Sequence, residues 1–217
     1  MQKRSTRIMA FIGAATAWFA VITQLYLMIA SRVVSIPETI LRFFSFFTID
    51  TNILVALCFT FIFLRGNSRS GRFLTKPTTL TAITIYITIV GIVYNVILRS
   101  IWQPEGLQKV IDELLHSVIP LLFILFWLIF VPIEQLKWKN AFSFLIYPVV
   151  YITYAVVHGA VTKFYPYPFV NVTRLGYNKT LFNAGLFLLA IFLLSLALIA
   201  TGKLLNKFDD GKKKVVS

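Results

Sequence analysis

The uncharged stretch LFNAGLFLLAIFLLSLALIATG at residues 181–202 decides the fold class of this chain. A helix needs about 20 mainly apolar residues to cross the roughly 30 Å hydrocarbon core of a bilayer, and this stretch supplies them. Because lipid offers the backbone no hydrogen bonds, such a stretch must be helical. Comparable segments precede it at residues 7–30, 39–64, 77–98, 113–132 and 140–162. The predicted fold is therefore all-α, with six transmembrane helices in one bundle that forms a single domain over residues 1–217.

The composition of the chain agrees with a polytopic membrane protein. Hydrophobic residues occupy 58% of the 217 positions, against roughly 45–50% in a soluble domain. The mean hydropathy is +0.81. Cys58 is the only cysteine, which excludes an intramolecular disulfide and any Cys-based zinc site. We expect neither a metal nor a cofactor.

The net charge of +13 has two interpretations, nucleic-acid binding or membrane topology. The basic residues lie in short loops and tails between apolar segments rather than along one soluble face. This distribution favours topology signals and attraction to anionic lipid headgroups. The expected partners are therefore membrane lipids and not nucleic acid, and the Lys212–Lys214 run is interpreted as a lipid-surface anchor.

The distribution of Lys and Arg also predicts an orientation. Fourteen of them flank the segments on the side of the N-terminus, and seven lie on the opposite side. Cytoplasmic loops of membrane proteins carry the excess of positive charge. We therefore expect both termini in the cytoplasm and the protein in the plasma membrane.

Several predicted spans carry polar side chains that hydrocarbon disfavours. Such groups usually face the bundle interior and mark a functional site. With both termini inside, most of them fall in the outer half of the bundle, and Thr48 lies about 14 Å below the outer end of its helix. This predicts one pocket that opens toward the outer leaflet. The polar residues are Thr48, Asp50, Thr51, Asn52, Asn95, His116, His158 and Asn183.

The chemistry that these residue types permit is nucleophilic hydrolysis. A Thr hydroxyl is a weak nucleophile until a base removes its proton, and His is the suitable base near neutral pH. Thr48 and Asn52 share a helix face, with Thr51 beside them, whereas Asp50 points away. The sequence has no Gly-x-Ser-x-Gly elbow, no His-Glu-x-x-His and no Gly-rich phosphate loop. In a membrane, however, Thr often bonds only its own helix, and a lone His often bridges two helices.

Three motifs resemble a known family, the androgen-induced integral-membrane hydrolases with their six-helix bacterial relatives. The segment FFTIDTNILV at 46–55 is similar to the family's Phe-x-Thr segment in the second span. The segment HSVIPLL at 116–122 is similar to its His-to-Pro segment in the fourth span, and YPYPF at 165–169 to its late Tyr-Pro-Phe element. Together with the number of spans, the resemblance covers nearly the whole chain.

The resemblance implies a hydrolase with a Thr nucleophile and a His base. Vertebrate members of the family cleave fatty acid esters of hydroxy fatty acids. By likeness, Thr48 is the nucleophile and His116 the general base, with Thr51 as the alternative nucleophile under a shifted register.

The prediction from the sequence is therefore an enzyme, an intramembrane hydrolase of lipid esters. Asn52, Asn95 or Asn183 is expected to donate to the oxyanion. His158 would orient His116, bind a substrate carboxylate, or join helices. Two alternatives remain: a carrier of lipids or small amphiphiles that performs no chemistry, and a haem protein with both His residues as axial ligands. The oligomeric state stays open.

Overall fold

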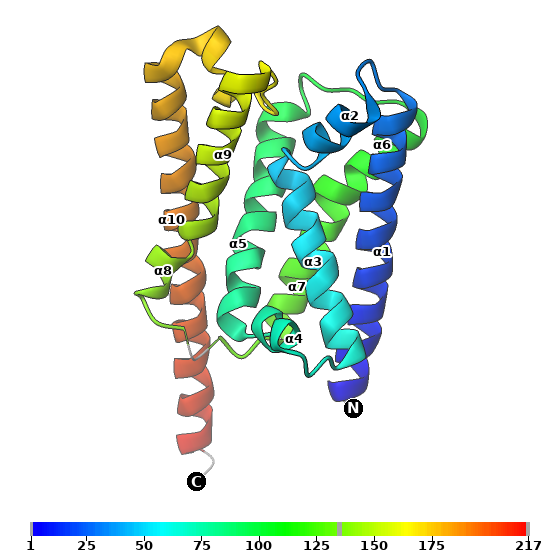
Figure 1. Cartoon of the computed structure of the whole chain (residues 1–217). Helices are drawn as coiled ribbons and strands as arrows, with labels where there is room; N and C mark the ends of the chain where they lie inside the picture. Colours follow the sequence, from blue (N-terminus) through cyan, green and yellow to red (C-terminus); the bar gives the residue numbers. More distant parts are fainter. Residues whose placement is uncertain (1, 134–135, 216–217) are drawn as a thin grey trace.

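The computed structural model of this protein is a bundle of helices (Figure 1). It describes residues 2–133 and 136–215, with side chains from 4 to 133 and from 136 to 204. Six helices are long and apolar enough to cross a membrane, so the all-α, six-helix, multi-pass prediction is confirmed. They are built from α1 (Gln2–Ala30), α3 (Phe47–Leu64), α5 with η1 (Pro77–Val93, Tyr94–Leu98), α6 with η2 and α7 (Gly106–Glu113, Leu114–Val118, Ile119–Phe130), α8 and α9 (Asn140–Ser143, Ile146–Thr162), and α10 (Val172–Val215).

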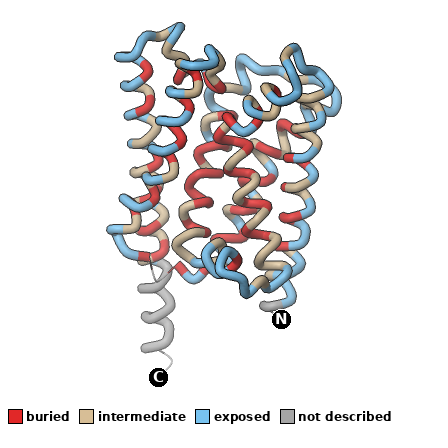
Figure 2. The backbone as a smooth tube through the Cα atoms, in the orientation of Figure 1, coloured by how far each residue is buried: buried red, intermediate tan, exposed pale blue. Residues whose placement is uncertain are grey.

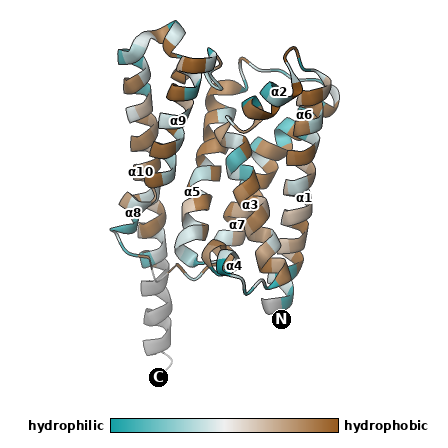
Figure 3. Ribbon diagram, viewed as in Figure 1, coloured by the Kyte–Doolittle hydropathy of each residue, from teal (hydrophilic) through white to brown (hydrophobic). Residues whose placement is uncertain are grey.

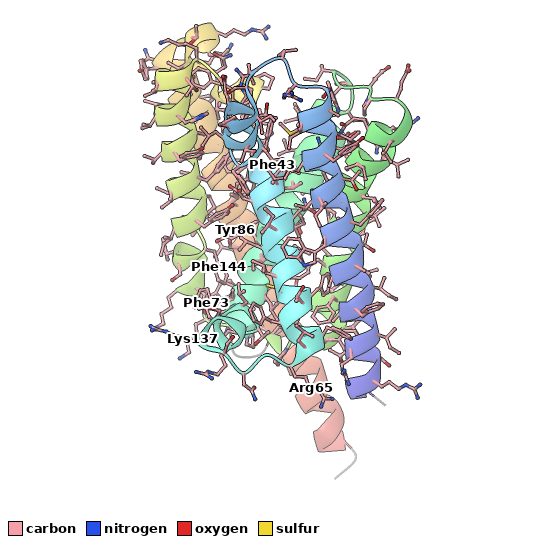
Figure 4. All side chains as sticks on the ribbon, turned by 45° about the vertical axis from the view of Figure 1, so that its right-hand side comes forward. Phe43, Arg65, Phe73, Tyr86, Lys137 and Phe144 are labelled. Atoms are coloured by element: carbon pink, nitrogen blue, oxygen red, sulfur yellow. The ribbon has the colours of Figure 1, made fainter. Side chains whose placement is uncertain are left out.

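Three shorter helices connect these spans. They are α2 (Ile36–Phe43), α4 (Arg69–Leu74) and the 3₁₀ turn η4 (Pro168–Val170). Both ends of the chain lie at the same end of the bundle, as an even number of crossings requires (Figure 1). Arg65 and Lys137 lie toward that end, whereas Phe43 lies toward the opposite end (Figure 4). The loops that follow α1, η1 and α9 therefore gather at the end remote from the termini.

The helices pack as a group of four with a pair beside it. Helix α3 contacts α1 and α5, and α7 contacts the same two helices, while α10 contacts α5 and α9. Gly13 allows α1 to approach α3 closely, because a Cβ there would lie 2.4 Å from the Phe59 ring. The inward faces are buried and the outward faces exposed (Figure 2), and the outward faces of the spanning helices are largely hydrophobic (Figure 3). This is the surface that a bilayer covers.

The second predicted span differs from the structure. The sequence predicted one helix over 39–64, but α2 ends at Phe43 and α3 begins at Phe47. Phe46 between them is extended, with φ −87° and ψ 121°. The Ser45 hydroxyl donates to the carbonyl of Arg42 at 2.6 Å and closes α2. Thr48 therefore lies in the first turn of α3, and the expected position about 14 Å down a continuous helix is wrong.

The third and fifth spans match their predicted segments, and the first, fourth and sixth have shifted ends. The fourth begins at Gly106 rather than 113 and passes through the π-helical turn η2. The sixth begins at Val172 rather than 181, with a kink at Gly176, where φ is 74°. A left-handed φ of this kind is accessible to glycine at little cost, so the helix can change direction there. The predicted anchor Lys212–Lys214 lies outside the residues whose side chains the structure describes.

Candidate functional site

Two tyrosine hydroxyls hold the first turn of α3. Helix α3 has no side-chain cap of its own, because Phe46 precedes it. The Tyr151 hydroxyl accepts the Phe47 N–H at 3.2 Å and donates to the carbonyl of Ser45 at 2.9 Å. The Tyr167 hydroxyl accepts the Thr48 N–H at 3.2 Å. Unpaired N–H groups at a buried helix start are costly, so α9 and the loop after it fix where α3 begins.

Thr48 and Tyr167 also interact through their side chains. The Thr48 Oγ1 and Tyr167 Oη atoms lie 3.1 Å apart. Burial raises the pKa of the Tyr167 phenol above its usual value, although the hydrogen bonds with Thr48 lower it. The phenol is therefore protonated at neutral pH. Since its oxygen already accepts the Thr48 N–H, its proton is available to Thr48 Oγ1 or to a bound molecule.

The YPYPF segment places Tyr167 through close aromatic contacts. Tyr165 lies directly on Gly159 of α9, where a Cβ would come within 2.1 Å of the Tyr165 ring. Tyr167 stacks on Phe169 with ring centroids 5.2 Å apart and meets Phe46 edge to face at 5.8 Å. The segment is thus packed against both α9 and the residue before α3. Its position determines where the Tyr167 hydroxyl lies.

His116 lies in the π-helical turn η2, opposite the second π-helical turn η1. Its ring stacks on Tyr94 of η1, with centroids 4.1 Å apart and an interplanar angle of 13°. Its Nδ1 lies 2.9 Å from the backbone carbonyl of Asp112 and 3.4 Å from Asp112 Oδ1. The neutral tautomer that donates from Nδ1 leaves Nε2 free to accept a proton. π-Helical turns are rare and are often found at functional sites.

Asp112 is a site residue that the sequence analysis missed, because the segment before 113 was assigned to a loop. Its side chain is 8% exposed, and Oδ2 has no hydrogen-bond partner among the described residues. The signal in the sequence is the spacing of four between Asp112 and His116 on one helix. A carboxylate beside Nδ1 stabilises the imidazolium that forms when Nε2 takes a proton.

Thr48, His116 and Tyr167 line two cavities that share these residues. The larger, of about 460 Å³, lies within the range of small-molecule sites and is also lined by residues of α1, η1 and α6. The second is a narrow apolar crevice whose walls come from α5, α9 and α10. The residues that line it include Ile89, Val90, Ile152, Ala184 and Phe187. The Thr48 hydroxyl therefore lies where a mixed polar and apolar space meets an apolar one.

The three asparagines bind backbone carbonyls. Asn52 Nδ2 donates to Thr48 O at 2.8 Å and Leu115 O at 3.2 Å, which joins α3 to η2. Asn95 Nδ2 donates to Gly91 O at 2.9 Å and His116 O at 3.4 Å. Asn183 Nδ2 donates to Phe169 O at 2.9 Å and lines the apolar crevice. The structure shows these amides joining the elements around the site, and Asn52 and Asn95 line neither cavity.

Thr51 and Asp50 lie on the α9 side of α3 and line neither cavity. Thr51 is fully buried and lies beside Tyr147, and Asp50 interacts with Tyr147 and Tyr151. Neither residue lines a cavity with His116. The structure therefore brings Thr48, and not Thr51, into the same space as the imidazole.

His158 lies apart from this site. It lines a separate hollow of about 280 Å³ with Glu38, Leu41, Arg42, Thr162 and Phe164. Its ring stacks on Tyr154 with centroids 5.4 Å apart, and its Nδ1 has no hydrogen-bond partner in the described part of the chain. The expectation of one shared pocket is thus wrong for His158, as it is for Thr51, Asn52 and Asn95, whereas Asp50 was expected to point away. His158 and His116 line different cavities.

The described residues contain no group of three or more His, Cys, Asp or Glu that could hold a metal ion. Comparison with known proteins finds no matching family model, no similar curated protein and no similar solved structure. The likeness to the androgen-induced hydrolases thus stays a prediction from sequence motifs.

Proposed function

We propose that this protein is an intramembrane hydrolase of lipid esters, with Thr48 as nucleophile and His116 as general base. One observation carries the proposal: the Thr48 hydroxyl, an imidazole with a carboxylate behind it and a protonated phenol line the same cavity. These are the parts of a nucleophile, base and orienting-group arrangement.

The residues supply each proton transfer of a two-step hydrolysis. His116 Nε2 accepts the proton of Thr48 Oγ1 as that oxygen attacks the ester carbonyl. The imidazolium, stabilised by Asp112, returns the proton to the alcohol oxygen as the ester bond breaks, which leaves an acyl group on Thr48. A water molecule then gives its proton to His116 and attacks the acyl group, and the acid leaves as Thr48 regains its proton.

Tyr167 is the proposed oxyanion donor in place of the asparagines. Its phenol oxygen lies 3.1 Å from Thr48 Oγ1, the attacking oxygen. In the tetrahedral intermediate, Oγ1 and the negatively charged oxygen of the substrate are bonded to the same carbon, so the phenol is near both. The first turn of α3 also places the positive end of the helix dipole beside Thr48. A fixed donor and a fixed dipole stabilise charge that develops only in the transition state.

We further propose that both termini lie in the cytoplasm and that the protein resides in the plasma membrane. The support is the twofold excess of Lys and Arg on the side of the termini. Under this orientation the site lies in the outer half of the membrane.

Removal of the nucleophile tests the proposed function. We expect Thr48→Ala to abolish hydrolysis of lipid esters by the purified protein, with little change in folded yield because a small hydroxyl leaves little cavity. Thr51→Ala is the matched control, since Thr51 is also buried in the same helix but lines neither cavity. Loss of activity in the Thr51 variant alone would assign the nucleophile to Thr51. Full activity in both variants would exclude threonine chemistry and favour a carrier.

The base is tested by comparison with a second histidine. His116→Ala should lower kcat by about 100- to 10,000-fold. His158→Ala should change it by no more than about threefold. The amount of folded protein in each variant is matched by size-exclusion chromatography. An inactive His158→Ala protein together with an active His116→Ala protein would refute the assignment of the base to His116.

Variants of the two tyrosines that cap α3, Tyr151 and Tyr167, test whether Tyr167 acts in catalysis or only stabilises the start of the helix. Tyr167→Phe should lower kcat by about 100- to 1000-fold, the usual cost of losing an oxyanion donor. Tyr151→Phe removes the neighbouring cap of α3 without touching the Thr48 side chain, so it should cost stability but little rate. Thermal unfolding and kcat are measured for both. Equal losses of kcat would show that Tyr167 acts only by holding the start of α3.

Orientation is tested with introduced cysteines, because the one native cysteine, Cys58, is buried. Asn67→Cys before α4 and Asn178→Cys in α10 both replace exposed residues at opposite ends of the bundle. A membrane-impermeant maleimide applied to intact cells should label the cysteine at 178 and spare the one at 67. The opposite pattern would invert the topology.

A further inference from the structure

The larger cavity has a mixed polar and apolar wall without Lys or Arg among the described residues. Beyond Thr48, His116, Tyr94 and Tyr167, its polar walls come from Gln24, Ser31, Gln108 and Asp112. No Lys or Arg lines it within the described part of the chain. A site that binds a carboxylate or phosphate normally offers Arg or Lys to it. The composition of this wall therefore disfavours an anionic group.

The carboxylate of Asp112 disfavours a negatively charged group of a ligand in the larger cavity. This carboxylate is buried, and Oδ1 faces His116, whereas Oδ2 has no hydrogen-bond partner in the described structure. A carboxylate oxygen accepts hydrogen bonds and repels another anion. The Tyr94 hydroxyl lies close to this carboxylate, and a substrate hydroxyl that donates to Oδ2 would be favourable there as well.

A pair of amides lies in the same wall. Gln108 Nε2 donates to Gln24 Oε1 at 2.8 Å, which joins α6 to α1. This bond leaves the Gln24 amide group and the Gln108 carbonyl oxygen able to donate and accept further. Neutral amides that offer both a donor and an acceptor match hydroxyl groups.

Arginines on the segments around the cavity have other partners. Arg99 forms an ion pair with Glu113 and lies over the Tyr94 ring. Arg42 pairs with Glu38 and lines the separate hollow with His158. Arg32 follows the lining residue Ser31 and donates to the carbonyl of Ile29 at 2.8 Å. None of these arginines lines the larger cavity.

We propose that the substrate is an ester of a neutral, hydroxyl-bearing alcohol, with the alcohol in the larger cavity. This inference rests on the proposed function and narrows its substrate class. It departs from the free-carboxylate esters that the family resemblance implies, because a carboxylate in the alcohol portion would meet Asp112 and no cation.

Three probes with the same acyl chain test the proposal on the purified protein. They are a monoacylglycerol, an ester of a hydroxy fatty acid with its carboxylate free, and the same ester with that carboxylate converted to a primary amide. We expect monoacylglycerol to be hydrolysed, and kcat/KM for the amide to exceed that for the free acid by at least about tenfold, since like charges at close range are strongly unfavourable. The Thr48→Ala protein gives the background for each probe.

Two variants that each add a positive charge test whether the preference for the amide over the free acid arises in the larger cavity. Gln108→Lys adds a cation to the wall and should reduce the preference for the amide over the free acid by about tenfold. Val110→Lys adds the same charge to the same helix at an exposed position that does not line the cavity, so the preference should stay unchanged. If Gln108→Lys fails to fold, Ser31→Lys supplies a cation from another wall.

The outcomes separate this inference from the proposed function. Hydrolysis with the free acid equal to or better than the amide would overturn the inference and leave the hydrolase intact. Hydrolysis of both fatty acid esters but not of monoacylglycerol would overturn it as well. Hydrolysis of none of the three would overturn the proposed function, and the inference with it.

Discussion

The pairing of two tyrosine hydroxyls with the first N–H groups of α3 is the constraint on which the site depends. Without Tyr151 and Tyr167, the start of α3 would leave buried donors unpaired, and α2 and α3 would have no reason to separate at 44–46. The same bonds draw α9 and the YPYPF segment against α3. Thr48 therefore has a fixed position in the first turn of α3. The Tyr167 phenol beside it accepts the Thr48 N–H and contacts the Thr48 hydroxyl.

The two π-helical turns make the second half of the site. They place Tyr94 and His116 face to face, while the carbonyl and carboxylate of Asp112 lie next to Nδ1. The closeness of the two turns depends on Gly91, where a Cβ would lie 3.2 Å from the His116 carbonyl. One helix thus carries both the imidazole and the groups that fix its tautomer, so the base is oriented before any substrate binds.

The six spans could be predicted from the sequence because length and hydropathy alone determine whether a helix can cross lipid. Thr48 and His116 could be selected as polar residues at similar depth, but depth does not determine which way a side chain faces. His158 has the right depth and lines a different hollow. The break before α3 could not be predicted, since its hydrogen-bond partners lie more than a hundred residues away. Asp112 could have been found from its spacing of four to His116.

The central claim is that Thr48 forms a covalent acyl intermediate. Its most direct test is to treat the purified protein with a fluorophosphonate and to locate the modified residue by peptide mass spectrometry. The account predicts a single adduct on Thr48, whose formation is much slower in the His116→Ala protein. An adduct on Thr51 or on any other residue, or no adduct on folded protein that hydrolyses esters, would contradict it.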